Sequence, residues 1–196
     1  AAVLLSSACS GPRSSAPVVQ LLETPAPTSS MAPNLALSVD GGVILSWLEQ
    51  GEPDAHSLRY SKLGRLHDKW SPPMTVVTRN DLFVNWADVP SLVQTRTGRL
   101  LAHWLQKSGD ATYAYDVRIA QSVDEGRTWS DSKVLHDDGL QGEHGFAELL
   151  RQAPEGLEPG THLGVARQDA GAVEVAVRGA GGLGRCVVAD TLLPQV

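Results

Sequence analysis

The sequence predicts an all-β protein made of repeats of four short antiparallel strands. Apolar runs of strand length are separated by turns rich in Gly, Asp and Pro, and helical periodicity is weak throughout the chain. A block of sequence also recurs at an offset of 57 residues. Internal repetition at such a spacing is typical of folds in which one small sheet is repeated.

The amino-acid composition indicates which classes of partner are not expected. The chain of 196 residues is long enough for one domain, and 22 acidic against 16 basic side chains give a formal charge of -6. Sequence-independent nucleic-acid binding depends on surplus Lys and Arg, so we expect no nucleic-acid partner. No apolar run approaches the roughly 18 residues of a membrane-spanning helix. We therefore expect membrane attachment only through an N-terminal lipid anchor.

The N-terminal residues have features of an export signal. Residues 1–9 begin apolar and end in Ser6-Ser7-Ala8-Cys9, as in a remnant of a bacterial lipoprotein signal with Cys9 as the lipidated residue. An ordinary secretory cleavage site and a buried cysteine are the alternatives. Residues 10–33 are rich in Ser, Pro and Ala and predict a disordered linker, so the folded domain is expected to start near Asn34. The expected location is the periplasm or cell envelope, with the outer membrane as the site of a lipoprotein.

Residues 34–150 contain two copies of the repeat. Gly41 and Trp47 align with Gly98 and Trp104 at the constant offset of 57 residues. Strands are expected near 35–39, 43–48, 57–61 and 70–77 in the first copy and near 91–96, 99–105, 112–121 and 129–135 in the second. Four antiparallel strands per copy correspond to one blade of a β-propeller.

The alignment is less regular beyond these positions. We pair Tyr60-Ser61 with Gln121-Ser122, although the offset drifts through loops of unequal length. Residues 151–196 predict a degraded or truncated third blade. The last 50 residues contain eight glycines and no aromatic side chain, which leaves a poorly packed terminus, a truncated gene and a frameshifted end as alternatives.

One motif in the second copy indicates the kind of blade. Residues 122–129 match every fixed position of the Asp-box, Ser-x-Asp-x-Gly-x-Thr-Trp. A short acidic side chain can accept N–H bonds across its own turn, glycine adopts an unusual backbone angle, and Trp buries a large apolar face. We therefore expect a structural role for the five motif residues, which are Ser122, Asp124, Gly126, Thr128 and Trp129.

With this motif the chain resembles the bacterial sialidase-like proteins with BNR or Asp-box repeats, a group described as exo-α-sialidases. Besides the Asp-box, the resemblance is carried by residues 85–91, 102–105, 113–115, 136–139 and 143–146. It implies a sialidase-type β-propeller, of which this chain would supply about two to three of an expected six blades. Open blade faces then imply either a partial chain or association with itself or another chain.

The resemblance also implies where a sugar would bind. Strand order places loops 49–56, 79–88, 106–111 and 136–145 at one end of the blades and the Asp-box at the other, and sialidase sites lie at the first end. The expected substrate-binding residues in these loops are Arg79, Asn85, Trp86, His136 and His144. Glycan is therefore the expected substrate or ligand.

Sialidases release terminal sialic acid with a Tyr nucleophile, an activating carboxylate and an Asp acid/base, and an arginine triad binds the sugar carboxylate. The resemblance makes Asp88 the candidate acid/base and Glu143 the candidate general base. Capping the bend before Pro90 is the alternative for Asp88, and a purely structural loop role is the alternative for Glu143. Arg79 is the one arginine clearly in a site-end loop, and no nucleophilic tyrosine is identified, since Tyr113 and Tyr115 are expected to pack.

Two histidines and three carboxylates lie between residues 136 and 144. They match no fixed zinc spacing, so neither a metal nor a cofactor is expected. The leading functional hypothesis is an exported sialidase-like hydrolase that releases terminal sialic acid or a related acidic sugar. The alternatives are a non-catalytic cell-surface propeller that binds glycans or proteins, and an inactive fragment.

Overall fold

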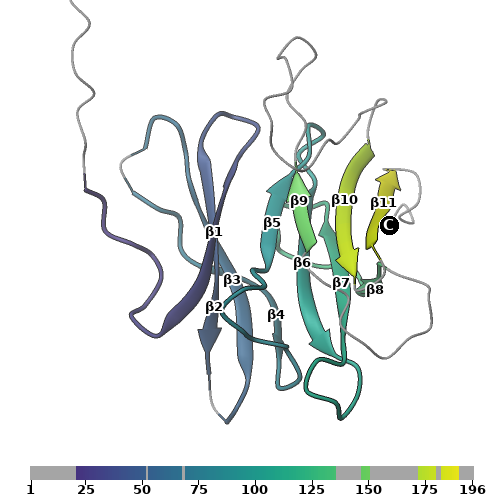
Figure 1. Ribbon diagram of the computed structural model, residues 1–196. Helices are drawn as coiled ribbons and strands as arrows, with labels where there is room; N and C mark the ends of the chain where they lie inside the picture. The colour runs from purple at the N-terminus through teal and green to yellow at the C-terminus, as the bar shows by residue number, and fades with distance from the viewer. Residues whose placement is uncertain are drawn as a thin grey trace, which may run out of the picture.

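The computed structural model describes residues 21–51, 53–67 and 69–135 in full and the backbone of residues 147–150, 172–179 and 182–189. All regular structure in these residues is β-strand, arranged as three antiparallel sheets (Figure 1). The all-β prediction is confirmed for the described part of the chain. No helix there is long and apolar enough to span a bilayer.

The first sheet contains four strands in sequence order, close to the positions that the sequence predicts. They are β1 (Ser30–Leu37), β2 (Val43–Gln50), β3 (His56–Leu63) and β4 (Met74–Arg79). Ile44, Ser46 and Leu48 of β2 are buried, as expected for a strand with one face against a core, and Trp47 on the other face is buried as well.

β1 begins earlier than the expected domain start near Asn34. Ser30 and Met31 already pair with Glu49 and Leu48 of β2. The register then shifts before Asn34, and Ala32 has a φ of 50°. Proline has no N–H for a sheet ladder, so Pro33 fits the bulge of an edge strand. The last residues of the expected linker 10–33 are therefore part of the sheet.

The second sheet repeats this arrangement. Its strands, again in sequence order, are β5 (Ser91–Gln94), β6 (Leu100–Lys107), β7 (Tyr115–Ser122) and β8 (Lys133–Val134). In β1 and β2 Leu35 pairs with Leu45, and in β5 and β6 Leu92 pairs with Ala102, which confirms the offset of 57 residues. Gly41 and Gly98 occupy equivalent hairpins with φ values of 79° and 89°, which glycine adopts without steric cost.

The expected alignment of the third strands is wrong by two positions. Val43 pairs with Leu63, and its equivalent Leu100 pairs with Ser122. The counterpart of Ser122 is therefore Leu63 and not Ser61. The motif at residues 122–129 consequently has no intact equivalent in the first sheet.

Hydrogen bonds around the two turns support the corrected alignment. The N–H of Ser71 donates to the carbonyl of Lys62 at 2.8 Å, and the N–H of Lys62 donates to the Ser71 hydroxyl at 3.0 Å. Ser130 and Gln121 repeat both bonds, at 2.9 and 3.2 Å. The two turns thus share their closing bonds although their sequences differ.

The two sheets pack face to face on one apolar core. Its buried residues are Ile44, Leu48, Leu58, Tyr60 and Val76 of the first sheet, Leu92, Leu100, Ala102, Trp104 and Ala120 of the second, and Leu82 between them. Burying each large apolar side chain stabilises the fold by about 1.5–3 kcal/mol. This core fixes the two sheets relative to each other.

The opposite face of the second sheet forms another core. Its buried residues are Val93, Leu101, Leu105, Tyr115, Val117 and Ile119. The third sheet has the order β11 (Gly182–Ala189), β10 (Ala172–Gly179) and β9 (Ala147–Leu150). β9 lies beside β5, as β5 lies beside β1 (Figure 1). The three sheets therefore succeed one another with their first strands as neighbours.

Candidate functional site

The segments that join β4 to β5 and β6 to β7 lie at the same end of the sheets, and the Asp-box turn lies at the other end because the strands are antiparallel. We call residues 79–90 together with residues 106–115 the rim. The rim contains the expected site residues Arg79, Asn85, Trp86 and Asp88. Glu143, His136 and His144, like the expected lipidation site Cys9, lie outside the described residues.

The connection after β4 is held against β6 by backbone bonds. The N–H of Phe83 donates to the carbonyl of Leu105 at 2.9 Å, and the N–H of Lys107 donates to the carbonyl of Asp81 at 2.8 Å. Leu82 lies between them, 4% exposed, in the shared core. The rim therefore has a backbone fixed by the fold at this point.

Arg79 forms an ion pair with Asp81, which lies just after it in the segment between β4 and β5. Its Nε and Nη2 donate to the two carboxylate oxygens of Asp81 at 2.6 and 2.9 Å. Gln106 Nε2 also donates to Asp81, at 3.1 Å. Arg79 holds the pKa of Asp81 below its usual value, and the same pairing raises the pKa of Arg79. The pair is locally neutral, and Nε and Nη2 of the guanidinium face Asp81, whereas the Arg79 side chain as a whole is 41% exposed.

Asn85 organises the bend that ends in Asp88. Its side-chain oxygen accepts hydrogen bonds from the N–H groups of Ala87 and Asp88, both at 2.7 Å. Its amide nitrogen donates to the Asp88 carboxylate. Asp88 is 8% exposed, whereas Trp86 at the tip of the same bend is 95% exposed. Asn side chains commonly bridge turns in this way, and the bend buries Asp88 and presents the indole of Trp86.

Aromatic side chains connect the rim to the core below it. Phe83 stacks on the fully buried Tyr115 with ring centroids 4.2 Å apart, and Tyr113 meets the edge of Phe83 at 6.4 Å. Tyr115 packs as the sequence predicts, but Tyr113 remains 59% exposed. Trp86 and Tyr113 are thus two exposed aromatic groups on one end of the molecule.

Sequence reasoning missed the roles of Phe83, Asp81 and Gln106. All three depend on the pairing of residues 81–83 with the end of β6. The apolar run Leu82-Phe83-Val84 is a sequence signal that this connection is partly buried, but it is weak because the run is short and lies between polar residues.

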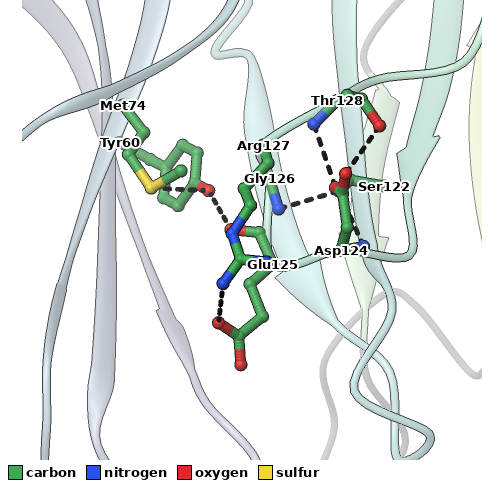
Figure 2. Close-up of polar contacts among 8 residues, drawn as sticks. All are labelled: Tyr60, Met74, Ser122, Asp124, Glu125, Gly126, Arg127 and Thr128. Atoms are coloured by element: carbon green, nitrogen blue, oxygen red, sulfur yellow. Dashed lines mark hydrogen bonds and ion pairs between the residues drawn. The ribbon is translucent and has the colours of Figure 1, made fainter.

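The polar side chains of the Asp-box turn form hydrogen bonds within the turn itself (Figure 2). Asp124 accepts bonds from the Thr128 N–H at 2.9 Å, the Thr128 hydroxyl at 2.7 Å and the Ser122 hydroxyl at 2.8 Å. These donors, those of Thr128 foremost, lower the pKa of Asp124 to about 2. The Ser122 oxygen in turn accepts the N–H of Gly126 at 2.8 Å. This geometry is that of a structural turn.

The same turn also contacts the first sheet. The hydroxyl of Tyr60 donates to the carbonyl of Glu125 at 3.0 Å (Figure 2). The ring of Tyr60 meets the edge of Trp129 with centroids 6.4 Å apart and planes at 83°. Burial, reinforced by the charges of Asp124 and Glu125, raises the pKa of Tyr60 to about 12. The Asp-box therefore joins two sheets as well as closing a hairpin.

No group of three or more His, Cys, Asp or Glu side chains within residues 21–51, 53–67 and 69–135 is placed to hold a metal ion. The rim offers aromatic faces, amide groups, the Arg79–Asp81 ion pair and the exposed charged side chains of Lys107 and Asp110. Such a combination suits the binding of a polar ligand with apolar faces.

The sequence matches no protein-family model and no curated protein. It is similar in structure to a protein of unknown function from Dyadobacter fermentans, with a TM-score of 0.51 and 15% sequence identity over 80% of this chain. The chain spans 37% of the length of that protein. This likeness extends to the fold alone.

Proposed function

We propose that the protein is an arc of a sialidase-type β-propeller that recognises glycans at its rim. The observation that carries this proposal is the 95% exposure of Trp86 on a bend fixed by Asn85. Large aromatic side chains are enriched at the centres of binding surfaces, and Tyr113, which is 59% exposed, lies at the same end of the molecule. The apolar face of a pyranose ring is a matching partner for an indole face.

Three features support the propeller arrangement. The sheets repeat one strand order, their first strands β1, β5 and β9 are neighbours, and an Asp-box closes the second sheet. In such an arrangement the loops of one end converge near an axis. An exported location, as the N-terminal sequence predicts, would expose this end to glycans of the cell surface or the surroundings.

Hydrolysis of a terminal sialic acid is the second candidate, favoured by the position of Asp88 just before β5. In this proposal Asp88 is the acid/base, Glu143 assists as general base, and Arg79 binds the sugar carboxylate. Binding ranks first because Asp81 engages Nε and Nη2 of Arg79 and Asn85 binds the carboxylate of the buried Asp88. Both contacts would have to open before catalysis.

Glycan binding tests the first proposal. Purified protein is applied to a panel of neutral and sialylated oligosaccharides, and the Kd of each ligand found is measured by titration calorimetry. We expect Trp86→Ala to raise the Kd at least about tenfold, since aromatic anchors dominate such sites. Leu66→Ala removes an equally exposed apolar side chain, 93% exposed, from the turn between β3 and β4, and should bind like the wild type. A Kd that Trp86→Ala leaves unchanged, or the absence of binding to every glycan of the panel, would refute the proposal.

Turnover of a fluorogenic sialoside tests the second candidate. Activity that falls with both Asp88→Asn and Glu143→Gln, in protein that still melts cooperatively, would support hydrolysis. Binding without turnover assigns the rim to recognition alone.

A further inference from the structure

The loop between β6 and β7 carries a second exposed aromatic side chain on the rim. This residue is Tyr113, which is 59% exposed. The N–H of Ser108 donates to the carbonyl of Ala114 at 3.0 Å, and the N–H of Ala114 donates to the carbonyl of Ala111 at 3.0 Å. Backbone hydrogen bonds of the loop itself therefore hold the chain next to Tyr113.

The ring of Tyr113 is also supported from within the protein. It meets the ring of Phe83 with centroids 6.4 Å apart, and Phe83 stacks on Tyr115, which is 0% exposed. Tyrosine offers a large contact area with few rotatable bonds. A ring that is already held loses little further freedom when a ligand binds. Tyr113 therefore has the properties of a ligand-binding residue.

Phe83 links Tyr113 to the bend that presents Trp86. Phe83 and Trp86 are three residues apart in the segment between β4 and β5, and three residues span at most about 11 Å. Among the described residues Phe83 contacts Tyr113, but no ring contact joins Tyr113 to Trp86. Trp86 and Tyr113 are therefore two neighbouring but separate aromatic surfaces.

The charges of the rim do not favour an acidic sugar. Residues 79–90 and 106–115 contain two basic side chains, Arg79 and Lys107, and three carboxylates, Asp81, Asp88 and Asp110. Arg79 is already paired with Asp81. These residues thus carry no surplus of positive charge that would attract the carboxylate of an acidic sugar.

We propose that the rim binds a neutral oligosaccharide through two subsites, with one sugar ring on Trp86 and another on Tyr113. This inference rests on the glycan recognition proposed above and adds the length and the charge class of the ligand. A chain of sugars engages both aromatic surfaces, whereas a single sugar engages one. Affinity therefore rises with chain length, and Tyr113 is the residue on which this rise depends.

Nuclear magnetic resonance titration of the full chain tests the chain-length dependence, because it measures weak as well as tight binding. The probes are glucose, mannose and N-acetylglucosamine, each as the single sugar and as its β-1,4-linked dimer and tetramer. In at least one series we expect the Kd of the tetramer to lie at least about tenfold below that of the single sugar. Tyr113→Ala should raise the Kd of that tetramer at least about tenfold and change that of the single sugar less than about twofold, whereas Trp86→Ala should raise both.

Two variants serve as controls. Thr112→Ala shortens the exposed side chain next to Tyr113 in the same loop, and it should bind every probe like the wild type. Tyr113→Phe keeps the aromatic ring and should keep most of the affinity for the tetramer. Because Tyr113 is exposed, Tyr113→Ala should still melt cooperatively, so a loss of affinity reports on binding.

A pair of ligands that differ only in a sialic acid tests the charge class. We expect sialyllactose to bind no more tightly than lactose. If sialyllactose binds at least about tenfold more tightly and Lys107→Gln removes the difference, the neutral class is wrong.

Other results separate a failure of this inference from a failure of the proposed function. The inference is overturned if a glycan binds through Trp86 with a Kd that does not depend on chain length or on Tyr113. It is also overturned if Tyr113→Ala weakens the single sugar as much as the tetramer, as a sugar held between two facing rings would require. Absence of binding in all three series, when another glycan binds, overturns it too. Absence of binding to every glycan overturns the proposed function itself.

Discussion

Gly126 meets two requirements at once. Its φ of 88° lies in the left-handed region, and a Cβ there would lie 1.8 Å from the hydroxyl oxygen of Tyr60. The first requirement belongs to the turn, and the second belongs to the contact between sheets. The Asp-box motif predicts the first requirement, whereas the second comes from a tyrosine far away in the sequence.

Gly126→Ala should therefore destabilise the protein more than a backbone effect alone. We expect the free energy of unfolding, measured with urea, to fall by about 1–2 kcal/mol from left-handed backbone strain. Overpacking against Tyr60 should lower it by a further amount of about 1–3 kcal/mol. Gly98→Ala is the control, because Gly98 has a φ of 89° with nothing within 4 Å of its Cβ position; it should show only the strain. Adding Tyr60→Phe should recover part of the loss in Gly126→Ala, and strict additivity would contradict this account.

Tyr60 should make stability fall at alkaline pH. The pKa of Tyr60 is about 12 in the folded chain, against an ordinary value of 10.0. The folded state therefore favours the neutral phenol, and this contribution is complete below pH 10 and lost as the pH rises through about 12. Melting temperatures measured across this range should converge for wild type and Tyr60→Phe. If the melting temperatures of the two proteins instead change in parallel with pH, ionisation of Tyr60 does not cause the alkaline loss of stability.

At the scale of elements, the Asp-box turn has no equal in the first sheet. Leu63, Arg65 and His67 stand where the second sheet has Ser122, Asp124 and Gly126. Both turns are closed by the same bonds to a serine. The difference lies in the network inside the turn, which the Asp-box provides through a carboxylate.

Asp124→Asn should weaken the protein in a defined pH window. The pKa of Asp124 falls from 3.8 to about 2 on folding, because Thr128 and Ser122 donate to the carboxylate. Its contribution is therefore present above pH 3.8 and lost as the pH falls through about 2. The difference in melting temperature between wild type and Asp124→Asn should shrink over that interval. A difference that does not depend on pH would exclude the carboxylate as its source.

The sequence predicted the strands well but not all of their ends. β7 starts at Tyr115, not near residue 112, because residues 108–114 close a loop through bonds from Ser108 to Ala114 and from Ala114 to Ala111. The last strands of the first and second sheets also begin later than expected, at Met74 and Lys133. In these two sheets the chain after Trp70 or Trp129 first completes the turn and pairs only afterwards. Such endings depend on hydrogen bonds that a hydrophobic pattern does not show.

At the scale of the whole molecule, the shared core joins the first and second sheets into one folding unit. Leu58 of β3 is fully buried in it, beside residues of β6 and β7. Neither sheet can lose its packing without exposing the other. Alternation in the sequence indicated which residues are buried, but it could not indicate which faces meet.

Leu58→Ala should therefore destabilise both sheets together. A cavity at this position should cost about 2–5 kcal/mol, and hydrogen exchange should show lower protection in β6 and β7 as well as in β2 and β3. Trp86→Ala, at a residue 95% exposed on the rim, is the control and should leave protection unchanged. Loss confined to the first sheet would show that the sheets unfold separately.

The rim was predicted in outline and missed in detail. Antiparallel topology was enough to place Arg79, Trp86 and Asp88 at one end of the sheets. The ion pair of Arg79 with Asp81 and the burial of Asp88 depend on local backbone geometry. A candidate list made from the sequence could therefore not separate groups available to a ligand from groups already bound within the protein.

The hairpin between β5 and β6 has a practical consequence. Its residue Thr97 is exposed, and nothing lies within 4 Å of the Cβ position of the neighbouring Gly98. A cysteine introduced at Thr97, with Cys9 and Cys186 replaced by serine, would let the protein be coupled to a biosensor chip in one orientation. The end that carries Trp86 would then point into the flowing solution, and the coating would not compete with sugars for it.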